Sequence, residues 1–235
     1  MAPSPQRIVV ETADALVAAA ASWIARGLAD AAASSGGATL ALAGGATPGP
    51  VYRRLATLPL IPWERIEIFF GDERAVPADH PASNYRMARE TLLSLVPIPP
   101  ERIHRMEAEQ PDLDAAARGY EALLPAALDL LLLGMGADGH TASLFPHAPA
   151  LAETDRRVVP VTGGEPLVQR LTVTPPVIKA AKSLLVLAAG TEKAEAVARA
   201  LEGPDAPAVV PAQLARRGTW IIDRAAAALL TGGGQ

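Results

Sequence analysis

The 235-residue sequence contains no cysteine. This absence excludes disulfide bonds, thiolate metal sites and cysteine nucleophiles, and it fits a reducing compartment, so we expect the protein in the cytoplasm. The opening residues, MAPSPQRIVV, lack the basic and apolar segments of a secretion signal. No run of residues approaches the roughly 18 consecutive apolar positions of a membrane span, so we expect no contact with a membrane.

The chain also lacks an excess of basic charge. It has 21 basic and 25 acidic residues and a net charge of -4, whereas nucleic acids and anionic membranes are bound by clustered basic residues. We therefore expect neither as a partner, and any anionic ligand must be met by a few individually placed side chains. Internal repeats and low-complexity linkers are absent too. With half of its residues hydrophobic, the chain is predicted to form one domain over residues 1–235, with mobile ends at 1–6 and 231–235.

Apolar runs alternate with helical patterns along the chain. We expect strands at ATLALAGG (38–45), RIEIFFGDER (65–74), LDLLLL (128–133), RRVVPV (156–161), QRLTVT (169–174), SLLVLAAG (183–190) and GTWIID (218–223). The RIEIFFGDER strand is expected to break at Gly71. The predicted helices cover 12–33, 47–58, 83–95 and the segment after Gly190, with a short helical turn before Phe145. Strands that are apolar on both faces and alternate with helices are typical of a parallel sheet covered on both sides. The predicted fold class is therefore α/β: three layers, with a Rossmann-like, mostly parallel sheet between helices.

Four of these strands end in polar loops that contain glycine. The loops are GGATPG (44–49), GDERAVP (71–77), GMGADGHTAS (134–143) and GTEK (190–193). Ligands of open parallel sheets bind beyond the carboxyl ends of the strands. If the four strands are neighbours, the sequence predicts that these loops share one cleft.

The first loop has the features of a phosphate site. Gly44 and Gly45 offer backbone N–H groups, Thr47 adds a hydroxyl, and a helix is expected to begin at Pro48. The motif has low specificity, because strand-to-helix turns also use glycine and Thr-Pro for structural reasons. It is neither the P-loop lysine motif nor G-x-G-x-x-G, so it does not imply a nucleotide.

The third loop contains a candidate general base, His140, with Asp138 as an orienting carboxylate. A lone histidine is more often structural, but flanking glycines favour a site. A metal site would need a third ligand, and His147, seven residues further on, offers no standard zinc spacing. We therefore expect no metal.

Charged residues of the other loops complete the candidate site. Asp72, Arg74 and Asn84 follow the second strand, where they form either a surface ion-pair cluster or part of the cleft. Arg170 and Lys193 are candidates for binding an anion. A lysine in the first turn of a helix opposes the helix dipole, and a nearby anion would offset that cost.

Four segments together resemble the 6-phosphogluconolactonase family, within the larger group that includes glucosamine-6-phosphate deaminases. They are LALAGGATPGPVYRRL, IEIFFGDERAVPADHPASNYRMARETLL, LDLLLLGMGADGHTASLFPHAP and RLTVTPPVIKAAKSLLVLAAGTEKAEAV. The resemblance covers residues 11–224, in the family's order. One departure is Ala46, where the family commonly has serine, so one hydroxyl near the expected phosphate is missing.

The resemblance implies a phosphosugar isomerase/deaminase-like fold and hydrolysis of 6-phospho-D-glucono-1,5-lactone to 6-phospho-D-gluconate, the second step of the oxidative pentose phosphate pathway. It implies that His140 activates water and that Asp138 orients the His140 imidazole. The substrate-binding residues are then Gly44, Gly45, Thr47, Arg74, Arg170 and Lys193 around the phosphate, and Asp72 and Asn84 at the sugar hydroxyls. No cofactor is required, because a lactone is an activated ester. We expect a monomer whose partner is the phosphosugar lactone.

Two other functions stay open. A glucosamine-6-phosphate deaminase-type isomerase shares the fold and has an aspartate at the place of Asp72. Its histidine loop, however, typically continues to a glutamate where this sequence has Phe145, and its DEY is DER here. A non-catalytic sugar-phosphate sensing domain usually carries a DNA-binding segment, for which the first 11 residues are too short.

Overall fold

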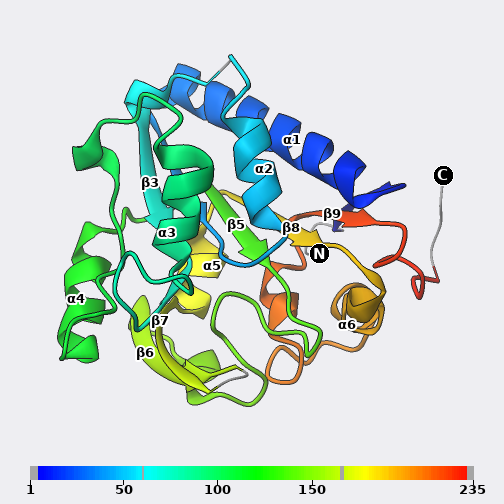
Figure 1. Ribbon diagram of the computed structural model, residues 1–235. Coiled ribbons are helices and arrows are strands. Elements are labelled where there is room, and N and C mark those ends of the chain that lie inside the picture. Colours follow the sequence, from blue (N-terminus) through cyan, green and yellow to red (C-terminus); the bar gives the residue numbers. More distant parts are fainter. Residues whose placement is uncertain (1–4, 60, 165–166, 232–235) are drawn as a thin grey trace.

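The computed structural model describes residues 5–59, 61–164 and 167–231. Its centre is a parallel six-stranded sheet in the order β1-β9-β8-β5-β2-β3 (Figure 1). The strands are β1 (Gln6–Val10), β2 (Ala38–Leu42), β3 (Ile66–Phe70), β5 (Leu130–Gly134), β8 (Ser183–Ala188) and β9 (Thr219–Asp223). All except the edge strand β1 are almost wholly buried, as predicted for a sheet covered on both faces.

Helices lie on both faces of this sheet, which confirms the predicted α/β class. They are α1 (Ala13–Ser35), α2 (Pro48–Leu55), α3 (Asn84–Ala88), α4 (Leu113–Leu123), α5 (Pro175–Ala180) and α6 (Ala194–Leu201). From β2 to β3 the chain moves in one direction across the sheet, and from β8 to β9 it moves in the other. Because crossovers between parallel strands are right-handed, α2 and α6 cover opposite faces, and α1 lies beside α2 (Figure 1).

Helix α1 shows how the sequence determines an element. Thr12 caps its first turn by accepting a hydrogen bond from the Ala15 amide, and Gly36 ends it in the left-handed conformation with φ 82°. By length and composition alone this helix could cross a membrane. In the fold its apolar face, which includes Leu16 and Leu28, is buried against the sheet and α2. These contacts account for its apolar composition without a membrane.

A small antiparallel sheet adjoins the main one. It has the order β4-β7-β6, formed by β4 (Asp72–Arg74), β6 (Val158–Gly163) and β7 (Val168–Val173). The strand predicted over 65–74 breaks at Gly71, as expected, and Asp72–Arg74 continue as a separate strand, β4. Gly71 donates its N–H to the Leu42 carbonyl of the main sheet, and its own carbonyl accepts from Val173 of the small one. This residue therefore redirects the chain from one sheet to the other.

Several local predictions were incomplete or wrong. Elements β1, α4 and α5 were not predicted, and the helix expected over 83–95 is α3 followed by a π-helical turn, Arg89–Leu93. The helical turn expected before Phe145 is a tight turn closed by pairing of Thr141 with Leu144, because Ala142 has φ 49° and cannot continue a right-handed helix. Of the ends expected to be mobile, residues 1–4 and 232–235 lie outside the described residues. Gln6 pairs with Thr219 as the first residue of β1.

The strand order creates a crevice between β2 and β5, which are neighbours. The chain leaves β2 toward β3 at one edge of the sheet and leaves β5 toward β8 on the other side. Loops that follow two such strands diverge to opposite faces, and ligands bind at this switch point. The loops concerned are the ones that contain Gly44 and His140.

Candidate active site

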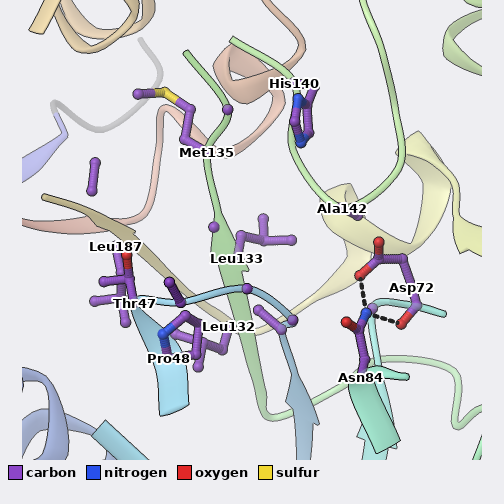
Figure 2. Close-up of a pocket in the computed structure, with 18 of the residues that line it drawn as sticks. Thr47, Pro48, Asp72, Asn84, Leu132, Leu133, Met135, His140, Ala142 and Leu187 are labelled. Atoms are coloured by element: carbon purple, nitrogen blue, oxygen red, sulfur yellow. Dashed lines mark hydrogen bonds between the residues drawn. The ribbon is translucent and has the colours of Figure 1, made fainter. Parts of the chain in front are cut away.

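The four glycine-containing loops meet at the carboxyl ends of the strands, as predicted. They enclose a cavity of about 300 Å³, which is at the lower end of the range for small-molecule sites. Its lining includes Gly44, Gly45, Thr47, Asp72, Arg74, Asn84, His140, Arg170 and Lys193. In Figure 2, His140 lies on the loop after β5, with the Asp72–Asn84 pair on one side of the pocket and Thr47 and Pro48 on the other.

Asp138 lies beside His140 and fixes its ring. Its Oδ1 atom is 2.6 Å from His140 Nδ1 and also accepts the His140 backbone N–H at 3.1 Å. An ionised carboxylate at this distance is best matched by N–H at Nδ1, which leaves the lone pair on Nε2. Partial burial raises the pKa of Asp138, but the hydrogen bonds from His140 outweigh it, so the pKa lies below the ordinary value.

The histidine loop has room for this pair only because residue 136 is glycine. A Cβ atom at Gly136 would lie 2.1 Å from His140 Nδ1 and 2.3 Å from Asp138 Oδ1. The Gly136 amide donates to the His140 carbonyl at 2.9 Å, and Thr141 Oγ1 donates to the Gly134 carbonyl at 2.8 Å. These two hydrogen bonds hold the loop in shape around Asp138 and His140.

Asp72 also lines the cavity, where it is buried in a hydrogen-bonded cluster. Ser143 Oγ donates to its Oδ2 at 2.6 Å, and Asn84 Nδ2 donates to its Oδ1 at 3.1 Å and to its carbonyl at 2.9 Å. Arg170 Nη1 lies 3.9 Å from Oδ2. Both carboxylate oxygens therefore already accept hydrogen bonds. Ser143 follows His140 by three residues, and the sequence analysis did not single it out as a partner of Asp72.

Glu73, which lies between the predicted site residues Asp72 and Arg74, anchors the segment that carries Arg74 and Asn84. Its buried carboxylate accepts hydrogen bonds from the backbone amides of Arg74, Asn84 and Tyr85 and from Ser83 Oγ, at 2.7–2.9 Å. Burial raises the pKa of Glu73, and these four donors act in the opposite direction. This residue joins β4 to the start of α3 and does not line the cavity.

The loop after β2 is packed directly on Asn84. A Cβ atom at Gly44 would lie 2.0 Å from Asn84 Oδ1, and Gly45 has φ 100°, so both positions require glycine. Thr47 is at the N-cap of α2, yet its side chain makes no capping hydrogen bond. Its hydroxyl is therefore available to a ligand in the cavity.

The three basic residues of the cavity differ in how far they are already engaged. Arg74 Nη1 donates to the Ala82 carbonyl at 2.7 Å, and Arg170 Nε donates to the Gly163 carbonyl at 3.2 Å. Burial lowers the pKa of Arg170, although Asp72 opposes this effect. The Lys193 side chain has no hydrogen bond or ion pair with the part of the chain that the structure describes. It is the cation most available to an incoming anion.

The loop that carries Lys193 is held by Asp223, at the end of β9. The Gly190 amide lies 3.1 Å from both oxygens of this buried carboxylate, and Gly190 has φ 95°. Glu192 also lines the cavity, which the sequence analysis did not predict.

Comparisons with known proteins show the family and the fold. The family described as glucosamine-6-phosphate isomerases/6-phosphogluconolactonase matches residues 11–222. A 6-phosphogluconolactonase of Synechocystis sp. is 40% identical over 237 residues, covering 95% of this chain and 97% of the relative. Among solved structures, the 6-phosphogluconolactonase from Trypanosoma brucei superposes with a TM-score of 0.84 and 32% identity, covering 97% of this chain and 99% of that one.

The same backbone also occurs in the rival enzyme. A monomeric glucosamine-6-phosphate deaminase superposes with a TM-score of 0.86 and 27% identity, covering 95% of this chain and 99% of that one. Backbone similarity therefore does not separate the two activities, which have to be distinguished by side chains and by higher sequence identity.

Proposed function

Because the chain belongs to the glucosamine-6-phosphate isomerase/6-phosphogluconolactonase family, we propose that its cavity hydrolyses 6-phospho-D-glucono-1,5-lactone to 6-phospho-D-gluconate with His140 as the general base. The protein is an enzyme, a hydrolase of a sugar-phosphate lactone in the pentose phosphate pathway. The observation that carries the assignment of the base is the 2.6 Å contact between Asp138 and His140 Nδ1 in a loop that lines the cavity.

In the proposed reaction His140 Nε2 takes a proton from water as the water oxygen attacks the lactone carbonyl. The resulting tetrahedral oxyanion collapses, the bond from the carbonyl carbon to the ring oxygen breaks, and the imidazolium returns its proton to that oxygen. Asp138 keeps Nδ1 protonated and stabilises the transient positive charge. The new carboxylic acid then ionises, which releases one proton for each lactone hydrolysed.

We assign the substrate phosphate to the side of the cavity formed by the loops after β2 and β8. A phosphate monoester carries about 1.5 to 2 negative charges at pH 7. Lys193 is the available point charge, Gly44, Gly45 and Thr47 offer N–H and hydroxyl donors, and Arg74 and Arg170 add positive potential. Asp72 and Asn84, whose hydrogen bonds fix their positions, are proposed to contact sugar hydroxyls.

We also propose that the protein is a cytoplasmic monomer. The lack of cysteine supports a reducing compartment, and the monomeric deaminase of the same fold supports the oligomeric state. Light scattering of the purified protein should give the mass of one chain, 24.3 kDa. Twice that mass would contradict this part of the proposal.

The activity is tested by adding the purified protein to freshly generated 6-phosphogluconolactone and following proton release, with glucosamine 6-phosphate assayed in parallel. We expect release well above the spontaneous rate and no ammonia from glucosamine 6-phosphate. Proton release at the spontaneous rate would contradict lactone hydrolysis, and ammonia release would favour the deaminase.

A further inference from the structure

Phe145 contacts both halves of the site, yet it has no part in the chemistry proposed above. Its ring centroid lies 4.8 Å from that of His140, with the planes tilted by 45°. The guanidinium carbon of Arg170 lies 5.5 Å from the same centroid. One aromatic ring thus stands between the proposed base and a cation of the substrate-binding side.

The Phe145 ring packs against the backbone of Gly163 and Gly164. A Cβ atom at Gly163 would lie 2.3 Å from both Cδ2 and Cε2 of Phe145. At Gly164, where φ is 89°, a Cβ atom would lie 2.6 Å from Arg170 Nη2. The Gly163 carbonyl also accepts the Arg170 Nε–H at 3.2 Å. The end of β6 therefore holds the ring and the guanidinium in one fixed arrangement.

His140 needs a second support besides Asp138. The hydrogen bond to Asp138 fixes one ring nitrogen, but the Asp138 side chain is 49% exposed and the His140 side chain 31%. The hydrogen bond to Nδ1 holds one atom of the ring and does not by itself set the tilt of the imidazole plane. Phe145 limits this tilt because its ring packs against the imidazole.

We propose that Phe145 is a positioning residue that fixes the plane of the His140 imidazole relative to Arg170. This inference rests on the proposed function, since it assigns Phe145 a part in the same reaction. With the imidazole held, Nε2 points at one place in the cavity, and Arg170 defines where the anionic substrate lies. Loss of the ring should therefore lower kcat more than it raises KM.

The test compares Phe145→Leu, which keeps apolar bulk, with Phe145→Tyr, which keeps the ring. Small misplacement of reacting groups costs up to about 100-fold in rate, so we expect kcat to fall by about 10-fold or more in the leucine variant. KM should change less than kcat, and the tyrosine variant should retain kcat within about threefold. Melting temperature is measured for each variant, so that loss of folding is recognised.

The matched control is Phe69→Leu. Phe69 stacks on His104 with centroids 4.6 Å apart, but neither residue lines the cavity, so this pair is a phenylalanine–histidine stack outside the site. Phe69 is 1% exposed, and its replacement should lower the melting temperature. It should leave kcat close to wild type. An equal loss of kcat in the control would assign the effect to stability and overturn the proposal.

Gly163→Ala gives an independent test, because the added methyl group displaces the ring without changing Phe145. We expect a loss of kcat like that of Phe145→Leu, and a less than additive loss when Gly163→Ala is combined with Phe145→Leu. A wild-type enzyme that hydrolyses the lactone, with kcat unchanged in both Phe145→Leu and Gly163→Ala, would overturn the inference alone. An inactive wild-type protein would instead contradict the proposed function.

Discussion

At the scale of single residues, the function depends on the dyad of His140 and Asp138. Hydrogen bonds to His140 overcome the effect of burial and hold the pKa of Asp138 below its usual value. A carboxylate hydrogen-bonded to Nδ1 stabilises the positive charge that develops on the imidazole during the reaction. Asp138 therefore contributes electrostatically as well as by orienting the ring.

Asp138→Asn tests this contribution. The variant keeps the shape of the side chain but loses the negative charge that stabilises the transient imidazolium, so kcat should fall by about 10-fold or more while KM changes less. Steady-state kinetics of both proteins on 6-phosphogluconolactone measure the effect. Wild-type kcat in the variant would contradict the role assigned to Asp138.

Lys193→Ala tests the proposed phosphate site. A charge-assisted hydrogen bond contributes about 1.5–3 kcal/mol, so KM for the phosphorylated lactone should rise by about 10- to 100-fold. Hydrolysis of unphosphorylated gluconolactone should not change. Lys179→Ala, an exposed lysine outside the cavity, is the matched control. Equal losses on both substrates would contradict the assignment of the phosphate.

At the scale of elements, the site depends on close approach between loops. A Cβ atom at Gly44 would lie 2.0 Å from Asn84 Oδ1 and 2.3 Å from its Cγ, so Gly44→Ala should push Asn84 away from Asp72. We expect kcat/KM to fall by about 10-fold or more, since misplacing site groups is costly.

Gly119→Ala is the control for this prediction. Gly119 lies in α4, and nothing lies within 4 Å of a Cβ atom placed there. Alanine should stabilise that helix by about 0.5–1 kcal/mol and leave activity unchanged. Steady-state kinetics and urea unfolding of the two variants test the pair of predictions. Wild-type activity in Gly44→Ala would show that the two loops are not in tight contact.

The same elements show what the sequence could predict. Buried strands and the glycine loops after them were recognisable, because a parallel sheet needs strands that are apolar on both faces, so the predicted cleft is correct. The break at Gly71 was also predicted, but the pairing of Asp72–Arg74 with β7 in a second sheet was not, because it depends on a strand far along the chain. The partnership of Ser143 with Asp72 was missed for the same reason, since 71 residues separate the two.

At the scale of the whole molecule, the strand order brings the binding loops together. Because the site is formed by segments from across the chain, a bound ligand should stabilise the entire fold. The product 6-phosphogluconate at 100 times its Kd should add about 2.7 kcal/mol, or roughly 5–10 °C in melting temperature. Gluconate at the same concentration should add much less. Equal shifts with both compounds would contradict a site built around phosphate.

The most direct test of the central claim is the steady-state kinetics of His140→Ala on freshly generated 6-phosphogluconolactone, beside the wild-type protein. A positioned general base contributes about 100- to 10,000-fold, so kcat should fall by that factor while KM changes little. The melting temperature should stay near that of wild type, because the His140 side chain is 31% exposed. A variant that keeps kcat and loses affinity would make His140 a binding residue and would contradict the mechanism proposed for this enzyme.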